Sequence, residues 1–308
     1  MNPIAERLAR QDVIVLDGAL ATELEARGFS ISDALWSAKA LFACPDLVRE
    51  VHLDYLRAGA DVVTSASYQA TVEGFMRCGF TEAEAAALLQ KSVRLAREAC
   101  ERYCSERGVD SGVPLVAASV GPYGAYRADG SEYRGDYGID EDALVAFHSE
   151  RLALLAEEKP DLLACETLPC LVEARAIVRA LRQEDIRIPA WFSFSCRNGA
   201  EISDGTRIAE CARFLNNVSE ALAIGLNCTA PQYVESLIGE IRRETTKPIV
   251  VYPNSGEMYD VQERRWYGAA ADFGAEARRW YAAGARLIGG CCRTTPREIA
   301  DIAAWAKN

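Results

Sequence analysis

The sequence has little histidine, no long apolar run and fewer basic than acidic residues. Its only histidines are His52 and His148, which excludes chemistry built on several imidazole groups, and we interpret both as packing residues. No apolar stretch approaches the ~20 residues that a membrane-spanning helix requires. The sequence has 34 basic and 45 acidic residues, which gives a net charge of −11. This balance argues against nucleic acid or an anionic membrane surface as the main partner, but it does not repel a cationic small molecule.

The N-terminal segment does not resemble a secretory signal, because Glu6 lies within it and no apolar stretch precedes Val13. We therefore expect a cytoplasmic protein. Half of the 308 residues are hydrophobic, so the chain can bury a large core. We expect one domain over residues 1–308, and a monomer, because no extra segment suggests an interface.

Short apolar runs rich in β-branched residues recur along the chain, as expected for strands buried on both faces. The expected strands are Val13–Leu16, Asp61–Thr64, Leu115–Ala118, Asp161–Ala164, Ala190–Phe194, Ala221–Leu226, Pro248–Tyr252 and Ala285–Ile288. Helical periodicity is found between and after them, in Pro45–Arg57, Thr81–Arg107, Asp140–Glu158, Cys170–Gln183, Arg207–Leu215, Pro231–Glu244, Asp272–Ala282 and Pro296–Ala306. This alternation predicts an α/β fold, a single (β/α)8 TIM barrel. The competing fold, an open doubly wound sheet, favours a Gly-rich phosphate turn after the first strand, which is missing here.

The connections that follow strands are longer than those that follow helices. Residues 121–138, 28–44 and 253–271 are rich in glycine, tyrosine or charge, whereas Ala283–Gly284 alone separates a helix from the next strand. Ordinary βα loops have about 2–6 residues, and much longer ones are usually functional. The surplus chain lies at the C-terminal ends of the strands, where barrel enzymes have their active sites.

Cysteine is abundant, with eleven residues at irregular spacing, and we interpret most of them as buried free thiols of a reducing compartment. Cys228 and the pair Cys291–Cys292 differ, because they follow predicted strands two places apart in the ring. Three thiolates at the mouth of a barrel make a zinc site, one ion per chain, with a fourth position open to water or substrate. The alternative is a pair of neighbouring cysteines buried by chance and an unrelated Cys228.

Three thiolate ligands leave zinc a weak Lewis acid, so such a site activates water poorly. It suits a fourth thiolate, because a free thiol titrates near pH ~8.5 whereas a metal-bound thiol is deprotonated outright. A methyl group on a positively charged sulfur is a matching electrophile, which an acidic protein with aromatic residues at the mouth tolerates. The rival functions are a zinc hydrolase or lyase, which would favour histidine or carboxylate ligands, and a zinc- or thiol-binding module without catalysis.

Specific motifs follow one another along almost the whole chain. They are Asp17-Gly-Ala-Leu-Ala-Thr-Glu-Leu, Leu35-Trp-Ser-Ala-Lys, Ser67-Tyr-Gln-Ala-Thr, Ser119-Val-Gly-Pro-Tyr-Gly-Ala-Tyr, Leu163-Ala-Cys-Glu-Thr, Gly225-Leu-Asn-Cys, Tyr252-Pro-Asn-Ser-Gly-Glu and Gly289-Gly-Cys-Cys-Arg-Thr-Thr-Pro. Together they resemble the homocysteine S-methyltransferase family, and the Asn-Cys and Gly-Gly-Cys-Cys motifs are the most specific. The likeness is to short bacterial and plant enzymes that use S-methyl-L-methionine. It implies methyl transfer to L-homocysteine to form methionine, with S-adenosyl-L-methionine as the competing donor.

The resemblance also implies roles for individual residues. Zinc would be held by the three cysteines, and the homocysteine thiolate would take the fourth position. Glu166 would bind the amino group of homocysteine, and Asp17 with Gly18 would help to hold its amino-acid end. The alternative roles are a helix cap for Glu166 and a tight turn for Asp17-Gly18.

The methyl donor has a separate set of candidate contacts. They are Trp36, Tyr68, Tyr123, Tyr126 and Asn254. Packing within the loops is the alternative interpretation of each.

Overall fold

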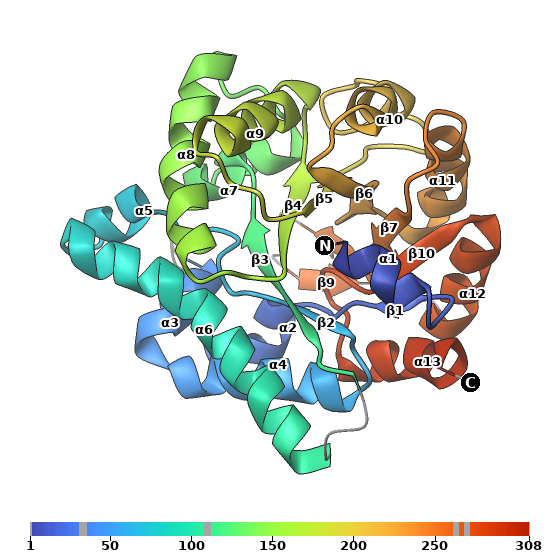
Figure 1. Cartoon of the computed structure of the whole chain (residues 1–308), viewed down its shortest axis with the longest axis horizontal. Coiled ribbons are helices and arrows are strands. Elements are labelled where there is room, and N and C mark those ends of the chain that lie inside the picture. Colours follow the sequence, from blue (N-terminus) through green and yellow to red (C-terminus); the bar gives the residue numbers. More distant parts are fainter. Residues whose placement is uncertain (1, 31–35, 108–111, 261–264, 268–271, 308) are drawn as a thin grey trace.

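The structure is a computed structural model that describes residues 2–30, 36–107, 112–260, 265–267 and 272–307. For residues 36, 258–260 and 265–267 it describes the backbone alone. Figure 1 shows the molecule along the axis of a barrel, with strands at the centre and helices around them.

Eight parallel strands form the wall of the barrel. They are β1 (Ile14–Val15), β2 (Val62–Thr64), β3 (Leu115–Val120), β4 (Leu162–Leu168), β5 (Ala190–Phe194), β6 (Ala221–Asn227), β7 (Ile249–Tyr252) and β10 (Ala285–Ile288). Their order in the sheet is β1, β10, β7, β6, β5, β4, β3, β2. A parallel bridge between Leu16 and Val62 joins the two ends of this series. The predicted (β/α)8 barrel is confirmed, and the open sheet is excluded.

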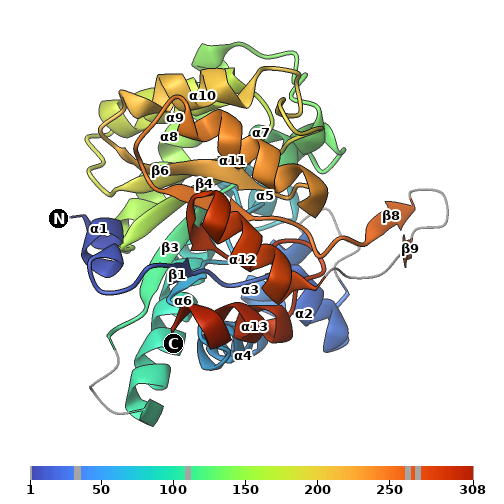
Figure 2. The same cartoon turned by 90° about the vertical axis from the view of Figure 1, so that its right-hand side faces the viewer.

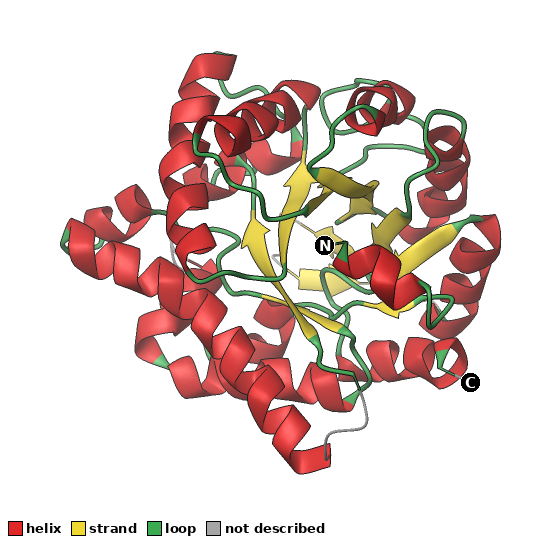
Figure 3. Cartoon of the chain, viewed as in Figure 1, coloured by secondary structure: helices red, strands yellow, loops and turns green. Residues whose placement is uncertain are grey.

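Helices cover the outside of the wall (Figure 3). The longer ones are α4 (Pro45–Arg57), α6 (Glu82–Arg107), α8 (Glu141–Glu157), α9 (Leu171–Gln183), α10 (Ile208–Asn216), α11 (Val234–Arg242), α12 (Phe273–Ala283) and α13 (Pro296–Ala306). Strand side chains alternate between this helical layer and the barrel interior. In β4, Leu163 and Cys165 pack toward the helices, whereas Leu162 and Ala164 face inward with Trp191. None of the described helices combines the length and apolar character needed to cross a bilayer.

Shorter elements occupy the two ends of the barrel. The helix α1 (Pro3–Leu8) packs Ile4 against the interior cluster, while the hairpin of β8 (Met258–Asp260) and β9 (Arg265–Tyr267) lies at the other end (Figure 2). Further short elements are α2 (Leu20–Ala26), the 3-10 helix Trp36–Lys39, α3 (Ala40–Ala43), α5 (Val72–Arg77), α7 (Tyr123–Arg127), and the 3-10 helices Ser131–Tyr133 and Pro231–Tyr233. Most of these short elements lie in the long connections that follow strands, as the sequence led us to expect for the functional face.

Helix α13 begins almost directly after the paired cysteines. Pro296 occupies its first turn, and Thr295 and Glu298 form a reciprocal capping box. Proline is favoured there because the first helical N–H groups have no partner within the helix, and the box satisfies two of those that remain. The chain that leaves Cys292 is therefore fixed within a few residues.

Candidate active site

The sulfurs of Cys228, Cys291 and Cys292 meet at the C-terminal ends of β6 and β10, which flank β7 in the ring. The Cys228 Sγ lies 2.6 Å from the Cys291 Sγ and 3.7 Å from the Cys292 Sγ, and the three ligand atoms lie within 4.8 Å of one another. Zn–S bonds of ~2.3 Å in a tetrahedron place sulfurs about 3.8 Å apart. The cluster has the size for one ion, although the closer pair must separate by about 1 Å to reach that geometry. The sequence-based prediction that these three cysteines come together is confirmed.

The backbone at the site is unusual and firmly held. Thr167, Cys228 and Arg293 have φ angles of 58°, 47° and 67°, in the left-handed region that residues other than glycine seldom occupy. The Cys291 N–H donates to the Pro253 carbonyl at 2.8 Å, which fixes the cysteine pair to the end of β7. Backbone strain of this kind gathers at functional sites, where the surrounding structure enforces it.

The three thiols compete for protons. The pKa of Cys292 is lowered because the neighbouring thiols donate hydrogen bonds to its sulfur, and Arg293 adds a favourable charge. The pKa of Cys291 is raised, because its hydrogen bonds to the two other sulfurs favour its protonated form. A cation that replaces the shared protons would satisfy all three sulfurs, so the donor set fits a thiophilic metal such as zinc.

Asp17 lies at the end of β1 and is only 8% exposed. Its carboxylate accepts hydrogen bonds from the Thr64 N–H at 2.7 Å and from the Thr64 Oγ1 at 3.0 Å. Burial, together with the smaller effect of the charge on Glu166, raises the pKa of this carboxyl to about 7. Gly18 has room only for glycine, since a Cβ there would lie 2.9 Å from Thr294 Oγ1 and from a ring atom of Tyr55. The Asp17 side chain thus joins two strands rather than closing its own turn.

Glu166, on β4, is likewise 8% exposed. Its carboxylate accepts a hydrogen bond from the Ser119 hydroxyl and another from the Tyr252 hydroxyl. Burial raises its pKa in spite of these two bonds. The helix that follows, α9, is capped by Cys170 and not by Glu166. A cation bound near these two buried carboxylates would offset both the cost of their burial and their mutual repulsion.

The candidate donor contacts fall into two groups. The Tyr68 hydroxyl hydrogen-bonds Thr167 and interacts electrostatically with Cys228. Asn254 follows β7, and its buried Oδ1 accepts no hydrogen bond from the residues that the structure describes. Trp36 begins a 3-10 helix, and its side chain lies outside the described part of the chain.

Tyr123 and Tyr126 belong to an aromatic cluster beside α8. The Tyr123 ring centroid is 5.0 Å from Phe147 and 5.4 Å from Tyr137. The Tyr126 ring packs on Phe147 and beneath the Arg77 guanidinium, which lies 5.0 Å from its centroid. These contacts match the alternative interpretation, packing within the loop, while contact with the donor stays a prediction.

Sequence reasoning missed two residues at the sulfurs. The Tyr133 hydroxyl donates a hydrogen bond to the Cys228 Sγ at 3.9 Å, and Glu132 precedes it in the same 3-10 helix. Both lie in the long segment 121–138, which the sequence marked as functional without indicating which of its residues reach the site.

A buried polar network holds that segment in place. The Arg151 guanidinium donates to the carbonyls of Gly121 and Tyr68 at 2.8 and 2.7 Å. Glu173 accepts from the Tyr137 hydroxyl at 2.7 Å and lies 3.0 Å from His148 Nε2. His148 is fully buried and burial lowers its pKa, so it belongs to this network as a packing residue.

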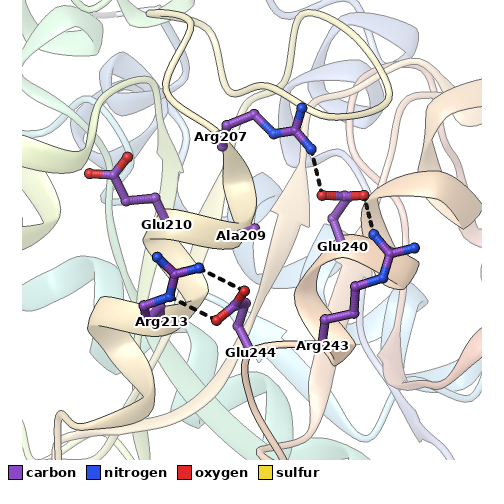
Figure 4. Close-up of a pocket in the computed structure, with 7 residues that line it drawn as sticks. All are labelled: Arg207, Ala209, Glu210, Arg213, Glu240, Arg243 and Glu244. Atoms are coloured by element: carbon purple, nitrogen blue, oxygen red, sulfur yellow. Dashed lines mark hydrogen bonds and ion pairs between the residues drawn. The ribbon is translucent and has the colours of Figure 1, made fainter.

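A separate hollow of about 350 Å³ lies between α10 and α11 on the outer ring (Figure 4). Arg207 and Arg243 both pair with Glu240, and Arg213 pairs with Glu244. Since each of these three guanidinium groups already has a carboxylate partner, they offer no free positive charge to an anionic ligand.

Comparison with known proteins decides the family. The family model described as homocysteine S-methyltransferase matches residues 14–306. The chain belongs to the homocysteine S-methyltransferase family. It is thus a methyltransferase whose methyl acceptor is homocysteine.

Relatives match this homocysteine S-methyltransferase over its full length. Homocysteine S-methyltransferase YbgG of Bacillus subtilis is 53% identical, over 100% of this chain and 99% of its own. The homocysteine S-methyltransferase of Escherichia coli is 49% identical, over 98% of each chain. A crystal structure of the Escherichia coli homocysteine methyltransferase MmuM, described as its metallated form, superposes with a TM-score of 0.89 at 48% identity and covers 98% of this chain and 99% of that one.

Proposed function

We propose that this homocysteine S-methyltransferase uses S-methyl-L-methionine as donor and binds one zinc ion through Cys228, Cys291 and Cys292. The observation that carries the proposal is the meeting of three sulfurs, and not four, among the described residues at the strand ends of the barrel. Structural zinc sites are closed by four protein ligands, whereas catalytic sites keep one position for a reactant. Zinc bound there would supply a deprotonated homocysteine thiol at neutral pH.

The protein's own residues would then align the acceptor. The carboxylates of Asp17 and Glu166 hold the ammonium group of homocysteine, and Gly18 lets the chain pass close to that end. The substrate thiolate attacks the methyl carbon in line with the departing sulfur, which leaves as a neutral thioether. Homocysteine and S-methylmethionine thus give two molecules of methionine. No protein general base is needed, and alignment contributes a large part of the rate.

A hydrolase or lyase fits the site less well. Most water-activating zinc sites include neutral histidine or a carboxylate, and here all three donors are thiols. We propose a cytoplasmic monomer whose partners are the two small-molecule substrates, with no nucleic acid or membrane. S-adenosyl-L-methionine is the alternative donor that an assay must compare.

The experiment is a zinc measurement combined with methionine formation from homocysteine and each donor. We expect one zinc per chain, and faster methyl transfer from S-methylmethionine than from S-adenosylmethionine. Cys291→Ser should lose zinc and activity together, whereas Cys78→Ser, at an exposed cysteine, should keep both. Full activity in a metal-free preparation would refute the zinc role, and a preference for S-adenosylmethionine would refute the donor.

A further inference from the structure

One partly buried carboxylate at the mouth of the site, that of Glu132, has no function in the reaction described so far. The Glu132 Oε2 is buried and accepts no hydrogen bond from any residue that the structure describes. An unpaired buried carboxylate is costly, so a protein retains one where a ligand supplies the partner.

Glu132 lies within electrostatic range of the sulfur cluster. Its carboxylate is close enough to Cys292 and to the Tyr68 hydroxyl to interact with both electrostatically. The next residue, Tyr133, places its hydroxyl 3.9 Å from the Cys228 Sγ, and its ring is 48% exposed at the mouth. A negative charge and an aromatic ring thus border the position where the methyl group must approach.

The local backbone fixes this position. A Cβ on Gly124 would lie 2.3 Å from the Glu132 nitrogen, so only glycine lets the two segments pack. The Ser195 hydroxyl donates to the Glu132 carbonyl at 3.3 Å, and Asp129 accepts from the Ser131 N–H at 2.9 Å. The backbone that carries the carboxylate is held in place before any ligand arrives, which limits the entropy that binding costs.

We propose that Glu132, with the ring of Tyr133, recognises the positive charge on the sulfonium of the methyl donor. This inference rests on the proposed function, in which the donor is a sulfonium. Asp17 and Glu166 serve the ammonium group of the acceptor, which leaves Glu132 for the second substrate. Aromatic faces and carboxylates both attract an alkylated cation.

The positive charge of the donor disappears during the reaction, and this decides how Glu132 affects KM and kcat. Thiolate and sulfonium become two neutral thioethers, so the attraction to Glu132 is strongest before transfer and weaker in the transition state. An interaction of this kind lowers the donor KM and does not raise kcat. It also favours release of methionine, whose sulfur carries no charge.

Two ligands that differ by this charge test the inference: S-methyl-L-methionine and L-methionine. Their affinities for the zinc-loaded enzyme can be measured by calorimetry for the wild type, Glu132→Gln and Asp136→Asn. Asp136 is an exposed acid of the same loop, ion-paired with Arg134, and it controls for loss of charge. We expect Glu132→Gln to weaken S-methylmethionine binding about 10- to 100-fold and methionine binding less than about twofold. The donor KM should rise by the same factor without a fall in kcat, and Asp136→Asn should change neither.

Each other outcome overturns the inference. Equal weakening of both ligands would mean that Glu132 binds the ammonium group that they share, and unchanged binding would place the carboxylate away from the donor. Zinc content and a thermal unfolding curve confirm that the variant is intact. If Glu132→Gln does not fold, Glu132→Asp allows the same comparison, because its side chain is one methylene shorter and holds the carboxylate further from the donor. Failure of the wild type to bind S-methylmethionine would refute the proposed donor itself.

Discussion

Asn227 and Thr167 make two reciprocal hydrogen bonds across the mouth of the barrel. The Thr167 N–H donates to Asn227 Oδ1, and Asn227 Nδ2 donates to Thr167 Oγ1, each at 2.7 Å. Asn227 directly precedes Cys228, and Thr167 directly follows Glu166. The bonds therefore couple the sulfur cluster to the carboxylate proposed for the acceptor.

Asn227→Ala should damage both functions at once. It leaves the buried Thr167 N–H unpaired and removes one partner of the Thr167 hydroxyl, so we expect the free energy of unfolding to fall by about 2–4 kcal/mol. Zinc affinity should drop about 10- to 100-fold, as for other residues that orient metal ligands, and the homocysteine KM should rise. Urea unfolding and a competitive zinc titration measure these effects. Asn217→Ala, at an exposed asparagine, is the control, and equal behaviour of the two variants would contradict the coupling.

Arg151→Lys should loosen the loops over the site. Burial lowers the pKa of Arg151 to about 10, so the guanidinium stays charged at neutral pH while it donates to backbone carbonyls. Lysine cannot reproduce this forked geometry. We expect a loss of about 2–4 kcal/mol in unfolding free energy and a higher donor KM. Arg94→Lys, at an exposed ion pair with Glu158, should stay within about 0.5 kcal/mol of the wild type. If Arg151→Lys changes neither the unfolding free energy nor the donor KM, the network does not position the loops.

Two glycine substitutions should have different effects: Gly124→Ala should raise the donor KM, and Gly239→Ala should raise the free energy of unfolding. Gly124→Ala forces the segment of Glu132 and Tyr133 away from the sulfurs, and should raise the donor KM at least about 10-fold. Gly239→Ala lies in α11, where a Cβ meets open space, and should stabilise the protein by about 0.5–1 kcal/mol. Steady-state kinetics and denaturant unfolding of both variants test this pair. Normal donor kinetics in Gly124→Ala would contradict the close packing.

Asp17 should make stability depend on pH. Its pKa is about 7 in the folded protein, against 3.8 for an ordinary aspartate. The folded state therefore holds the proton longer than the unfolded state, and stability falls as pH rises from about 4 to about 7. Asp17→Asn removes this term, so its stability relative to the wild type should improve by about 3 kcal/mol between pH 5 and pH 8. Unfolding without homocysteine, at both pH values, measures the difference. A difference independent of pH would mean that Asp17 has an ordinary pKa.

The framework of the fold was predictable because it has a periodic signal. The strands Ala190–Phe194 and Ala285–Ile288 have the predicted bounds, as do the helices that begin at Pro45 and Pro296. In both helices proline marks the first turn. The short helices α2, α5 and α7 were missed, since elements of one or two turns show no reliable period. The β8–β9 hairpin was missed in the same way, inside the predicted loop 253–271.

The site was predictable only where the barrel fixes it. Cys228 and Cys291 follow two of the predicted apolar strands, and parallel strands bring their ends to one face. Glu132 and Tyr133 reach that face through a loop shaped by Gly124, Ser195 and Arg151. Such tertiary contacts leave no pattern in the local sequence.

The strand that carries the paired cysteines is also the one that completes the ring. β10 bonds to β1 on one side and to β7 on the other. Until it docks, Cys228 stands 63 residues from Cys291 along the chain, with nothing to bring the two sulfurs together. High zinc affinity should therefore appear only in molecules in which β10 has docked and the barrel is closed. A metallochromic dye that reports free zinc during refolding would then give the time of this last docking step.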